Sequence, residues 1–362
     1  MTIKSLLLSS AAMLAAVSSA RAADAVIAAE PEPLEYVKIC DAYGAGYFFI
    51  PGSETCLKIG GKVRTEGKWY DAYNPGSKAG TLWHTRAELQ LQTATDTEYG
   101  PLKTNTELRW DWNDGNSTST NLLHASISLG GFTVGKEDSQ YNVFTGYAGD
   151  VINDDVVYDG PYELNQLTYN YDAGNGFTAV ISLEDSNSSS DASSYGGAWV
   201  TSKANHYAPN VVAGAGYKAG AWSFKVVGGY DSIGEEGAIK ARVDADFGVF
   251  SAFLMGGYNT DGSKLNQYAG SNNDESTCPT NQGYLCGWGD WAVWGGVGVP
   301  VNEKLKWNLQ VAYTDSKIFA ATTNVKWNPV KNLLVEPELS YTSWDSVKTD
   351  QWSGILRFER SF

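Results

Sequence analysis

The sequence has few residues of the kinds that build metal and redox sites. It contains only four cysteines, three histidines and three methionines among 362 residues. The cysteines show no C-x-x-C spacing and the histidines, His84, His124 and His206, are not clustered. No nucleophile motif such as G-x-S-x-G accompanies them. The sequence therefore predicts no metal site, no cofactor and no enzymatic activity.

Long hydrophobic runs are also missing beyond the first 22 residues. Residues 1–22 contain Lys4, an apolar run from Leu6 to Val17 and the sequence Ala20-Arg21-Ala22. This pattern predicts a cleaved signal peptide, with the mature chain beginning near Ala23. No later stretch approaches the roughly 20 apolar residues that a membrane-spanning helix needs. The exported chain is therefore either soluble outside the cytoplasm or crosses a membrane with strands.

Positive charge is scarce. Lysine and arginine number 26 against 41 aspartates and glutamates, which gives a net charge of −15. The predicted signal peptide holds Lys4 and Arg21 and no acid, so the mature chain would carry −17. Such an acidic chain is a poor candidate for binding nucleic acid. The 39 glycines, 13 tryptophans and 21 tyrosines suit a β-barrel with aromatic girdles, and they also suit a secreted β-sandwich.

Strict alternation of polar and apolar residues is what the sequence has in abundance. From Leu57 to Tyr70 the even positions carry five charges, whereas the odd positions are apolar, glycine or threonine. This period of two is typical of a strand with one polar face. The chain ends on a similar strand, in which Leu356, Phe358 and Phe362 share one face. We count sixteen such segments: 57–70, 83–93, 102–112, 123–129, 132–136, 164–171, 177–184, 211–217, 222–230, 238–246, 249–258, 291–299, 305–313, 318–327, 333–341 and 352–362.

The connections between these segments alternate in length. One set is short and rich in Gly, Pro, Asn and Asp, as tight turns are. The other set includes all three long connections, 138–163, 185–210 and 259–290. Short turns at one end and long loops at the other are the layout of an outer-membrane barrel. The predicted fold is therefore all-β, a 16-stranded antiparallel transmembrane β-barrel that covers residues 56–362, wide enough for a water-filled channel.

An exported chain folds in an oxidising compartment, so its four cysteines are expected to form disulfides. The pairing Cys40–Cys56 and Cys278–Cys286 closes two short loops and is the simplest of three possible connectivities. The first pair would close a segment before the barrel, within residues 23–55, on the periplasmic side. Whether this segment plugs the lumen, contacts a periplasmic partner or merely packs is left open.

Specific motifs resemble the general porins of the alphaproteobacterial outer membrane. They are the run from Glu35 to Leu57, the run from Phe144 to Val156, the run from Trp288 to Gly296, and the terminal Arg360-Ser-Phe362. The resemblance implies a homotrimer in the outer membrane, in contact with lipid and lipopolysaccharide. It also implies passive diffusion of small hydrophilic solutes and ions, and a third extracellular loop that folds into the pore. Arg360 departs from the pattern, because an apolar residue often faces lipid at that position.

Residues 138–163 form the third connection at the long-loop end, which corresponds to this third extracellular loop, and they are acidic. Their carboxylates are predicted to line the constriction, and the opposite wall is predicted to be basic because strand register puts five cations at similar height. Glutamates interleave with those cations, whereas the loop acids have few apparent partners, so weak cation selectivity is expected. The predicted loop residues are Asp150, Asp154, Asp155, Asp159 and Glu163, and the predicted wall residues are Lys62, Arg64, Arg86, Arg109 and Arg357.

Other interpretations remain open at this point. The acidic loop could be an ordinary solvated surface loop, and the wall charges could be salt bridges that only solvate the lumen. The barrel could be a substrate-preferring channel, or a surface adhesin or receptor whose loops bind a partner. The charged inner face, which carries both signs at similar heights, favours a water-filled pore.

Overall fold

The computed structural model describes residues 38–71, 79–113, 117–154, 156–185, 208–262, 266–270, 287–345 and 348–362. The chain divides into the units Met1–Lys38 and Ile39–Phe362, and the second unit is described here. The predicted signal peptide, residues 23–37 of the segment 23–55, Asp155, and the pair Cys278 and Cys286 lie outside the described residues. Within the described residues, no helix is long and apolar enough to cross a membrane.

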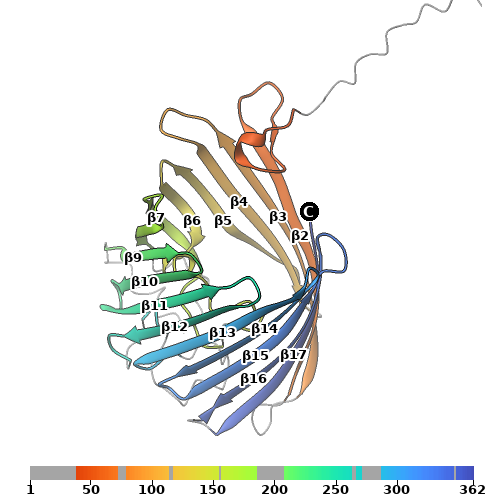
Figure 1. Ribbon diagram of the computed structural model, residues 1–362, viewed down its shortest axis with the longest axis vertical. Helices are drawn as coiled ribbons and strands as arrows, with labels where there is room; N and C mark the ends of the chain where they lie inside the picture. The colour runs from red at the N-terminus through yellow and green to blue at the C-terminus, as the bar shows by residue number, and fades with distance from the viewer. Residues whose placement is uncertain are drawn as a thin grey trace, which may run out of the picture. The chain divides into compact units, whose positions relative to one another are not determined.

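Sixteen antiparallel strands close into a barrel (Figure 1). The last strand pairs with the first, from Ser353 opposite Tyr70 to Ser361 opposite Lys62. All sixteen predicted strands are present, which confirms the predicted fold. The strands are β2 (Cys56–Tyr70), β3 (Gly80–Thr95), β4 (Leu102–Asn113), β5 (Ser119–Leu129), β6 (Phe132–Asp138), β7 (Glu163–Asp172), β8 (Phe177–Glu184), β9 (Asn210–Ala219), β10 (Trp222–Asp231), β11 (Glu236–Asp246), β12 (Ser251–Asn259), β13 (Trp291–Asn302), β14 (Leu305–Thr314), β15 (Ile318–Trp327), β16 (Leu333–Trp344) and β17 (Thr349–Ser361).

The two faces of each strand differ as the alternation predicted. In β2 the apolar side chains of Ile59, Val63 and Trp69 are 49%, 53% and 43% exposed, because they point outward. Glu66 lies in the opposite phase and is only 1% exposed. An apolar outer face and a polar inner face are what a barrel needs to lie between lipid and a water-filled lumen.

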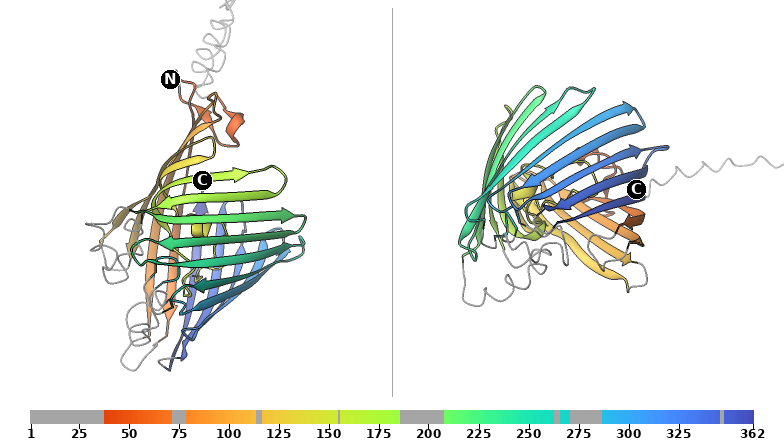
Figure 2. Two further views of the ribbon diagram at one scale, coloured as in Figure 1. Left: turned by 90° about the vertical axis from the view of Figure 1, so that its left-hand side faces the viewer. Right: turned by 90° about the horizontal axis from the view of Figure 1, so that it is seen from below.

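Short turns join successive strands at one end of the barrel, as between β9 and β10 and between β11 and β12 (Figure 2). The turn between β5 and β6 consists of Gly130 and Gly131, with φ of +58° and +89°. Only glycine adopts such values without strain, and a Cβ on Gly131 would lie 2.8 Å from the carbonyl oxygen of Asn170. A long connection, residues 139–162, follows β6, and we name it the inserted loop. The structure describes all of its residues except Asp155.

A short segment before the barrel is fastened to the short-turn end. A disulfide joins Cys40 to Cys56 at the start of β2, as predicted. A 3-10 helix, η1 (Asp41–Tyr43), and a two-residue strand, β1 (Phe48–Phe49), lie between the two cysteines. β1 was not predicted, and it pairs with the first residues of β2. The Tyr43 hydroxyl donates to Asp96, 2.6 Å away, in the turn after β3.

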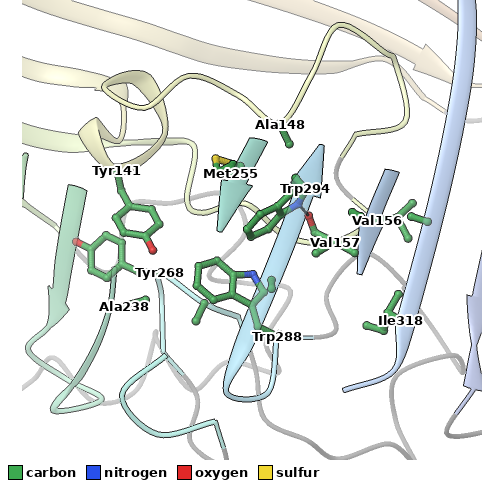
Figure 3. Close-up of a cluster of buried hydrophobic side chains, with 14 of the residues drawn as sticks. Tyr141, Ala148, Val156, Val157, Ala238, Met255, Tyr268, Trp288, Trp294 and Ile318 are labelled. Carbon is green, nitrogen blue, oxygen red and sulfur yellow. Dashed lines mark hydrogen bonds between the residues drawn. The ribbon is translucent and has the colours of Figure 1, made fainter. Parts of the chain in front are cut away.

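The hydrophobic core lies inside the barrel rather than between layers (Figure 3). It forms where the inserted loop packs against inward-facing residues of the later strands. Tyr141 and Val157 of the loop are fully buried there with Trp288 and Trp294. This apolar packing holds the loop against one side of the lumen and so positions the site described next.

Candidate pore constriction

The inserted loop turns inward at its first residues. Its short helix, α2 (Gln140–Val143), is capped by the Ser139 hydroxyl, which accepts from the backbone N–H of Tyr141 at 3.2 Å. Glu184 of β8 accepts from the Ser139 hydroxyl at 2.8 Å and from the backbone N–H of Gln140 at 2.9 Å. A carboxylate at a helix N-terminus satisfies otherwise unpaired N–H groups, so these contacts fix where the loop leaves the wall.

A buried lysine ties the two ends of the loop to the wall. Lys240 of β11 is fully buried and its Nζ donates to Asn142 Oδ1 at 2.8 Å and to the carbonyl oxygen of Asp159 at 2.5 Å. The same ammonium lies 4.5 Å from the centroid of the Tyr141 ring. A buried charge is tolerated only when it is fully partnered, so Lys240 stabilises one arrangement of the loop.

Asp159 belongs to the same group of buried contacts that holds the loop, and its side chain does not face the pore. It is 1% exposed, and its carboxylate accepts from the backbone N–H of Ala148 at 3.0 Å and from Asn142 Nδ2 at 3.2 Å. Burial raises the pKa of Asp159 despite the nearby ammonium of Lys240. A carboxylate so enclosed has no direct contact with permeating ions.

Two tryptophans hold the second half of the loop. The indole N–H of Trp288 donates to the carbonyl oxygen of Tyr158 at 2.5 Å, and that of Trp294 donates to the carbonyl oxygen of Val157 at 3.2 Å. The rings lie 5.3 Å apart at a steep angle (Figure 3). Each side chain contributes a large apolar surface and a donor, a combination suited to holding an irregular segment.

The tip of the loop contacts β14, β15 and β16. Asp150 pairs with Lys306 of β14 at 2.6 Å and with Lys326 of β15. The backbone N–H groups of Ile152 and Asn153 donate to Glu338 of β16 at 2.5 Å and 2.8 Å. Burial alone would raise the pKa of Asp150, but hydrogen bonds from the two lysines outweigh it and lower that pKa.

These contacts correct the expectation that the loop carboxylates have few partners. Asp150 has two lysine partners, and Asp159 is buried with hydrogen-bond donors. Asp154 and Glu163 also interact with other residues, and Asp155 lies outside the described residues. The lysine partners of Asp150 come from strands more than 150 positions further along the chain, so the composition around the loop does not reveal them.

A sequence signal for the missed lysines exists. Lys306 and Lys326 occupy the polar phase of two adjacent strands and stand directly opposite each other in the register. Like charges opposite each other across strands are destabilising unless something neutralises them. Asp150 supplies that neutralisation from the loop.

The five predicted wall cations lie on four adjacent strands, β17, β2, β3 and β4, which we name the basic wall. Each pairs with a carboxylate of a neighbouring strand. The pairs are Lys62–Glu88 at 2.9 Å, Arg64–Glu359 at 2.7 Å, Arg86–Asp111 at 2.6 Å, Arg109–Glu88 at 3.2 Å and Arg357–Glu66 at 2.5 Å. The cation side chains are 14–25% exposed, whereas the Glu66 and Glu88 side chains are 2% and 8% exposed. Glu66 and Glu88 are therefore more deeply buried than the cations with which they pair.

The described histidines belong to the same lumen networks. His84 lies between Glu66 at 3.0 Å and Asp111 at 2.7 Å. His124 lies 3.0 Å from Glu107 and 3.3 Å from Asp138. Among the described residues, no group of His, Cys, Asp and Glu could hold a metal ion.

A closed barrel with an apolar exterior, a charged interior and a loop folded into that interior defines a membrane diffusion channel. The chain belongs to the porin family: a family model described as "Porin subfamily" matches residues 24–357. It is 43% identical to porin Omp2b of Brucella neotomae and 42% identical to porin Omp2a of Brucella melitensis, over the full length of both chains in each case. The family places the protein in the bacterial outer membrane and makes it a channel rather than an enzyme.

Solved structures agree on the fold. The outer-membrane channel DcaP of Acinetobacter baumannii matches with a TM-score of 0.62 at 14% identity, covering 87% of this chain and 99% of that one. An anion-selective porin from Comamonas acidovorans matches with a TM-score of 0.59 at 16% identity, covering 85% of this chain and 100% of that one. At these identities the likeness concerns the fold.

Proposed function

We propose that this porin is a general diffusion channel for small hydrophilic solutes and ions, with a weak preference for cations. The observation that carries the proposal is the inserted loop, which is fastened to β8 and to strands from β11 to β16, whereas the basic wall lies on the next strands around the barrel, β17 and β2–β4. Charges of opposite sign facing each other across a narrow water column orient dipolar solutes and penalise apolar ones. Purified protein in planar bilayers should give stepwise conductance that rises with salt concentration. Barrels that insert and never conduct would contradict the proposal.

The cation preference is supported by a modest excess of carboxylates around the loop. The basic wall is close to balanced, because every named cation has a carboxylate beside it. Around the loop the balance is negative: among the described residues, the loop and the strand side chains hydrogen-bonded to it include six carboxylates and four cations. The carboxylates are Asp138, Asp150, Asp154, Asp159, Glu184 and Glu338, and the cations are Lys240, Arg242, Lys306 and Lys326.

Selectivity is tested by replacing Asp150, Asp154 and Asp155 with asparagine. The reversal potential under a KCl gradient should move toward that of chloride, and Asp150→Asn alone should account for most of the movement because it leaves Lys306 and Lys326 facing each other uncompensated. Glu98→Gln, which removes an exposed acid in the turn after β3, is the matched control. Unchanged reversal potentials in the triple variant would show that the loop does not set selectivity.

We also propose a homotrimer in contact with lipid and lipopolysaccharide. The proposal rests on the family resemblance, together with the apolar outer face. The mass of the detergent-solubilised protein, corrected for bound detergent, should correspond to three chains. A monomeric mass in mild detergents that preserve conductance would contradict it.

Residues 1–22 are proposed to be removed during export. Amino-terminal sequencing of protein isolated from outer membranes should then begin near Ala23. A mature chain that retains Lys4 would exclude the proposed cleavage.

A further inference from the structure

A recess of about 360 Å³, lined by both polar and apolar residues, lies beneath the tip of the inserted loop, on the side of the short turns. Gly149 and Asp150 of the loop lie on one side of it, and the inward faces of β11–β14 supply the rest. Its charged and polar lining residues are Asp150, Arg242, Asp244, Asp246, Ser251, Lys306 and Asn308. The recess is distinct from the ion pairs of the basic wall.

One buried acceptor in this recess lacks a partner. Asn308 is 2% exposed and its Oδ1 has no hydrogen bond. Its orientation is dictated by its neighbour Asn324, whose Nδ2 faces three oxygens, those of Asp150, Glu336 and Glu338. Asn324 must therefore present its own oxygen to Asn308, and the Asn308 Nδ2 donates to it at 2.9 Å. The Asn308 oxygen is thereby left without a partner at the recess.

The space at this oxygen exists because residue 298 is glycine. A Cβ there would lie 2.9 Å from Asn308 Oδ1, 3.0 Å from Ser251 Oγ and 2.8 Å from Lys306 Cε. Two residues further along β14, the Gln310 Oε1 is also buried without a partner and lies close to Gly149. An unpaired buried carbonyl is energetically unfavourable, so the Asn308 oxygen marks a place at the recess where a donor can be accommodated.

The charges around the recess favour a cationic donor. Both cations are engaged, since Arg242 pairs with Asp244 at 2.7 Å and donates to the carbonyl oxygen of Tyr147, and Lys306 pairs with Asp150. The Asp150 and Asp244 side chains remain 45% and 33% exposed. Their oxygens and the Asn308 carbonyl give the site an excess of acceptors.

We propose that this recess is a binding subsite for small organic solutes that carry a primary ammonium group. The ammonium donates to Asn308 Oδ1 in the hollow at Gly298 and is attracted by Asp150 and Asp244. Because a primary ammonium supplies three N–H donors and a quaternary ammonium supplies none, the site distinguishes such solutes from quaternary ammonium ions of equal charge. The inference requires only that the barrel conducts, and it is independent of the cation preference proposed above.

The experiment measures inhibition of the KCl current in planar bilayers by two probes of equal charge. Ethanolammonium chloride should reduce the current in a saturable way, whereas tetramethylammonium chloride at the same concentration should not. Gly298→Ala fills the hollow with a Cβ, and Asn308→Leu removes the acceptor. Each should raise the half-inhibiting concentration of ethanolammonium about tenfold, the loss expected for one hydrogen bond to a charged group.

Two matched controls separate this effect from general disturbance. Gly295→Ala lies in the same strand, where a Cβ would meet its nearest neighbour at an ordinary 3.7 Å. Asn170→Leu removes an exposed asparagine in the inward phase of β7. Both should retain the inhibition seen for the unaltered protein. Equal inhibition by the two probes, or unchanged inhibition in Gly298→Ala, would overturn the proposal while leaving the channel function intact.

Discussion

Two sides of the same lumen handle charge in different ways. On the basic wall, charges are neutralised within the sheet, between neighbouring strands, as in the pairs Arg357–Glu66 and Lys62–Glu88. On the side of β11–β16, strand side chains reach away from the sheet to the inserted loop, as Lys240 and Lys306 do. The first wall would keep its ion pairs without the loop, whereas the second would be left with unpaired charges.

Charged side chains in the lumen therefore have two roles: some lie beside the water-filled channel, and others hold the inserted loop in place. The cations of the basic wall are partly exposed, so they can meet water and solutes in the lumen. The buried contacts of Lys240 and Asp159 are removed from water, so these groups fix the loop and do not meet permeating ions directly. Formal charge counted along the sequence does not separate these two roles.

The largest effect on the difference between the two sides of the lumen is expected from a substitution of Lys240. Replacing Lys240 with methionine keeps the length of the side chain but leaves Asn142 Oδ1 without its donor and Asp159 without its nearest cation. Removing one partner of a buried charged pair costs about 3–5 kcal/mol. The variant barrel should unfold at lower urea concentration, and its open-channel current should be noisier because the loop is released.

Lys218→Met is the matched control, since Lys218 is an exposed lysine near the short-turn end of β9. It should change neither the unfolding midpoint nor the noise. If Lys240→Met behaves like this control, the buried lysine does not hold the loop.

The fold was predictable from the sequence because its physical signal is local. Alternation with a period of two and turn residues at the short connections are properties of neighbouring residues, so β2 and the glycine turn after β5 could be placed without knowing the rest. The positions of the wall cations followed from the same logic, because strand register links residues such as Arg64 and Arg86 directly.

The contacts of the inserted loop could not be predicted from such local patterns. The sequence of residues 139–162 does not indicate that Asp150 pairs with lysines more than 150 positions later in the chain. It also does not indicate that the Asp159 carboxylate is buried and accepts hydrogen bonds within the loop. Trp288 and Trp294 appeared in the sequence only as family markers, although their indole N–H groups hold the loop. Contacts of an irregular segment depend on the three-dimensional path of the chain, and no local period encodes that path.

Removing the disulfide before β2 should not alter the charged groups on either side of the lumen. Replacing Cys40 and Cys56 with serine opens the 16-residue separation that the disulfide closes. The chain-entropy model assigns about 3 kcal/mol to a loop of roughly 15 residues. Unfolding should therefore occur at lower urea concentration, while single-channel conductance and reversal potential stay unchanged. An altered conductance would show instead that the segment before β2 reaches into the conducting path.

On the basic wall the sharpest single change is Glu66→Gln. Glu66 is 1% exposed and contacts Arg357, His84 and Lys68, so glutamine keeps the shape and removes the charge that balances them. We expect a loss of about 1–3 kcal/mol in stability and a reversal potential moved toward that of chloride. Open-channel noise should not rise, in contrast to Lys240→Met, because the loop keeps its contacts. A rise in noise equal to that of Lys240→Met would remove the distinction between the two walls.

The smallest expected effect is the pH dependence of the loop tip. The pKa of Asp150 is lowered by its hydrogen bonds from Lys306 and Lys326, which outweigh its burial. A lowered pKa means that its ion pairs are fully present above the ordinary aspartate pKa of about 3.9 and are lost only as the pH falls through the lowered value. The open-channel noise of the unaltered protein should therefore be constant from neutral pH to about pH 4 and rise below it. Asp150→Asn should be noisier at neutral pH and lack the acid-induced rise. If the noise of the unaltered protein already rises between about pH 7 and pH 6, well above the range in which aspartate titrates, groups other than Asp150 govern the loop.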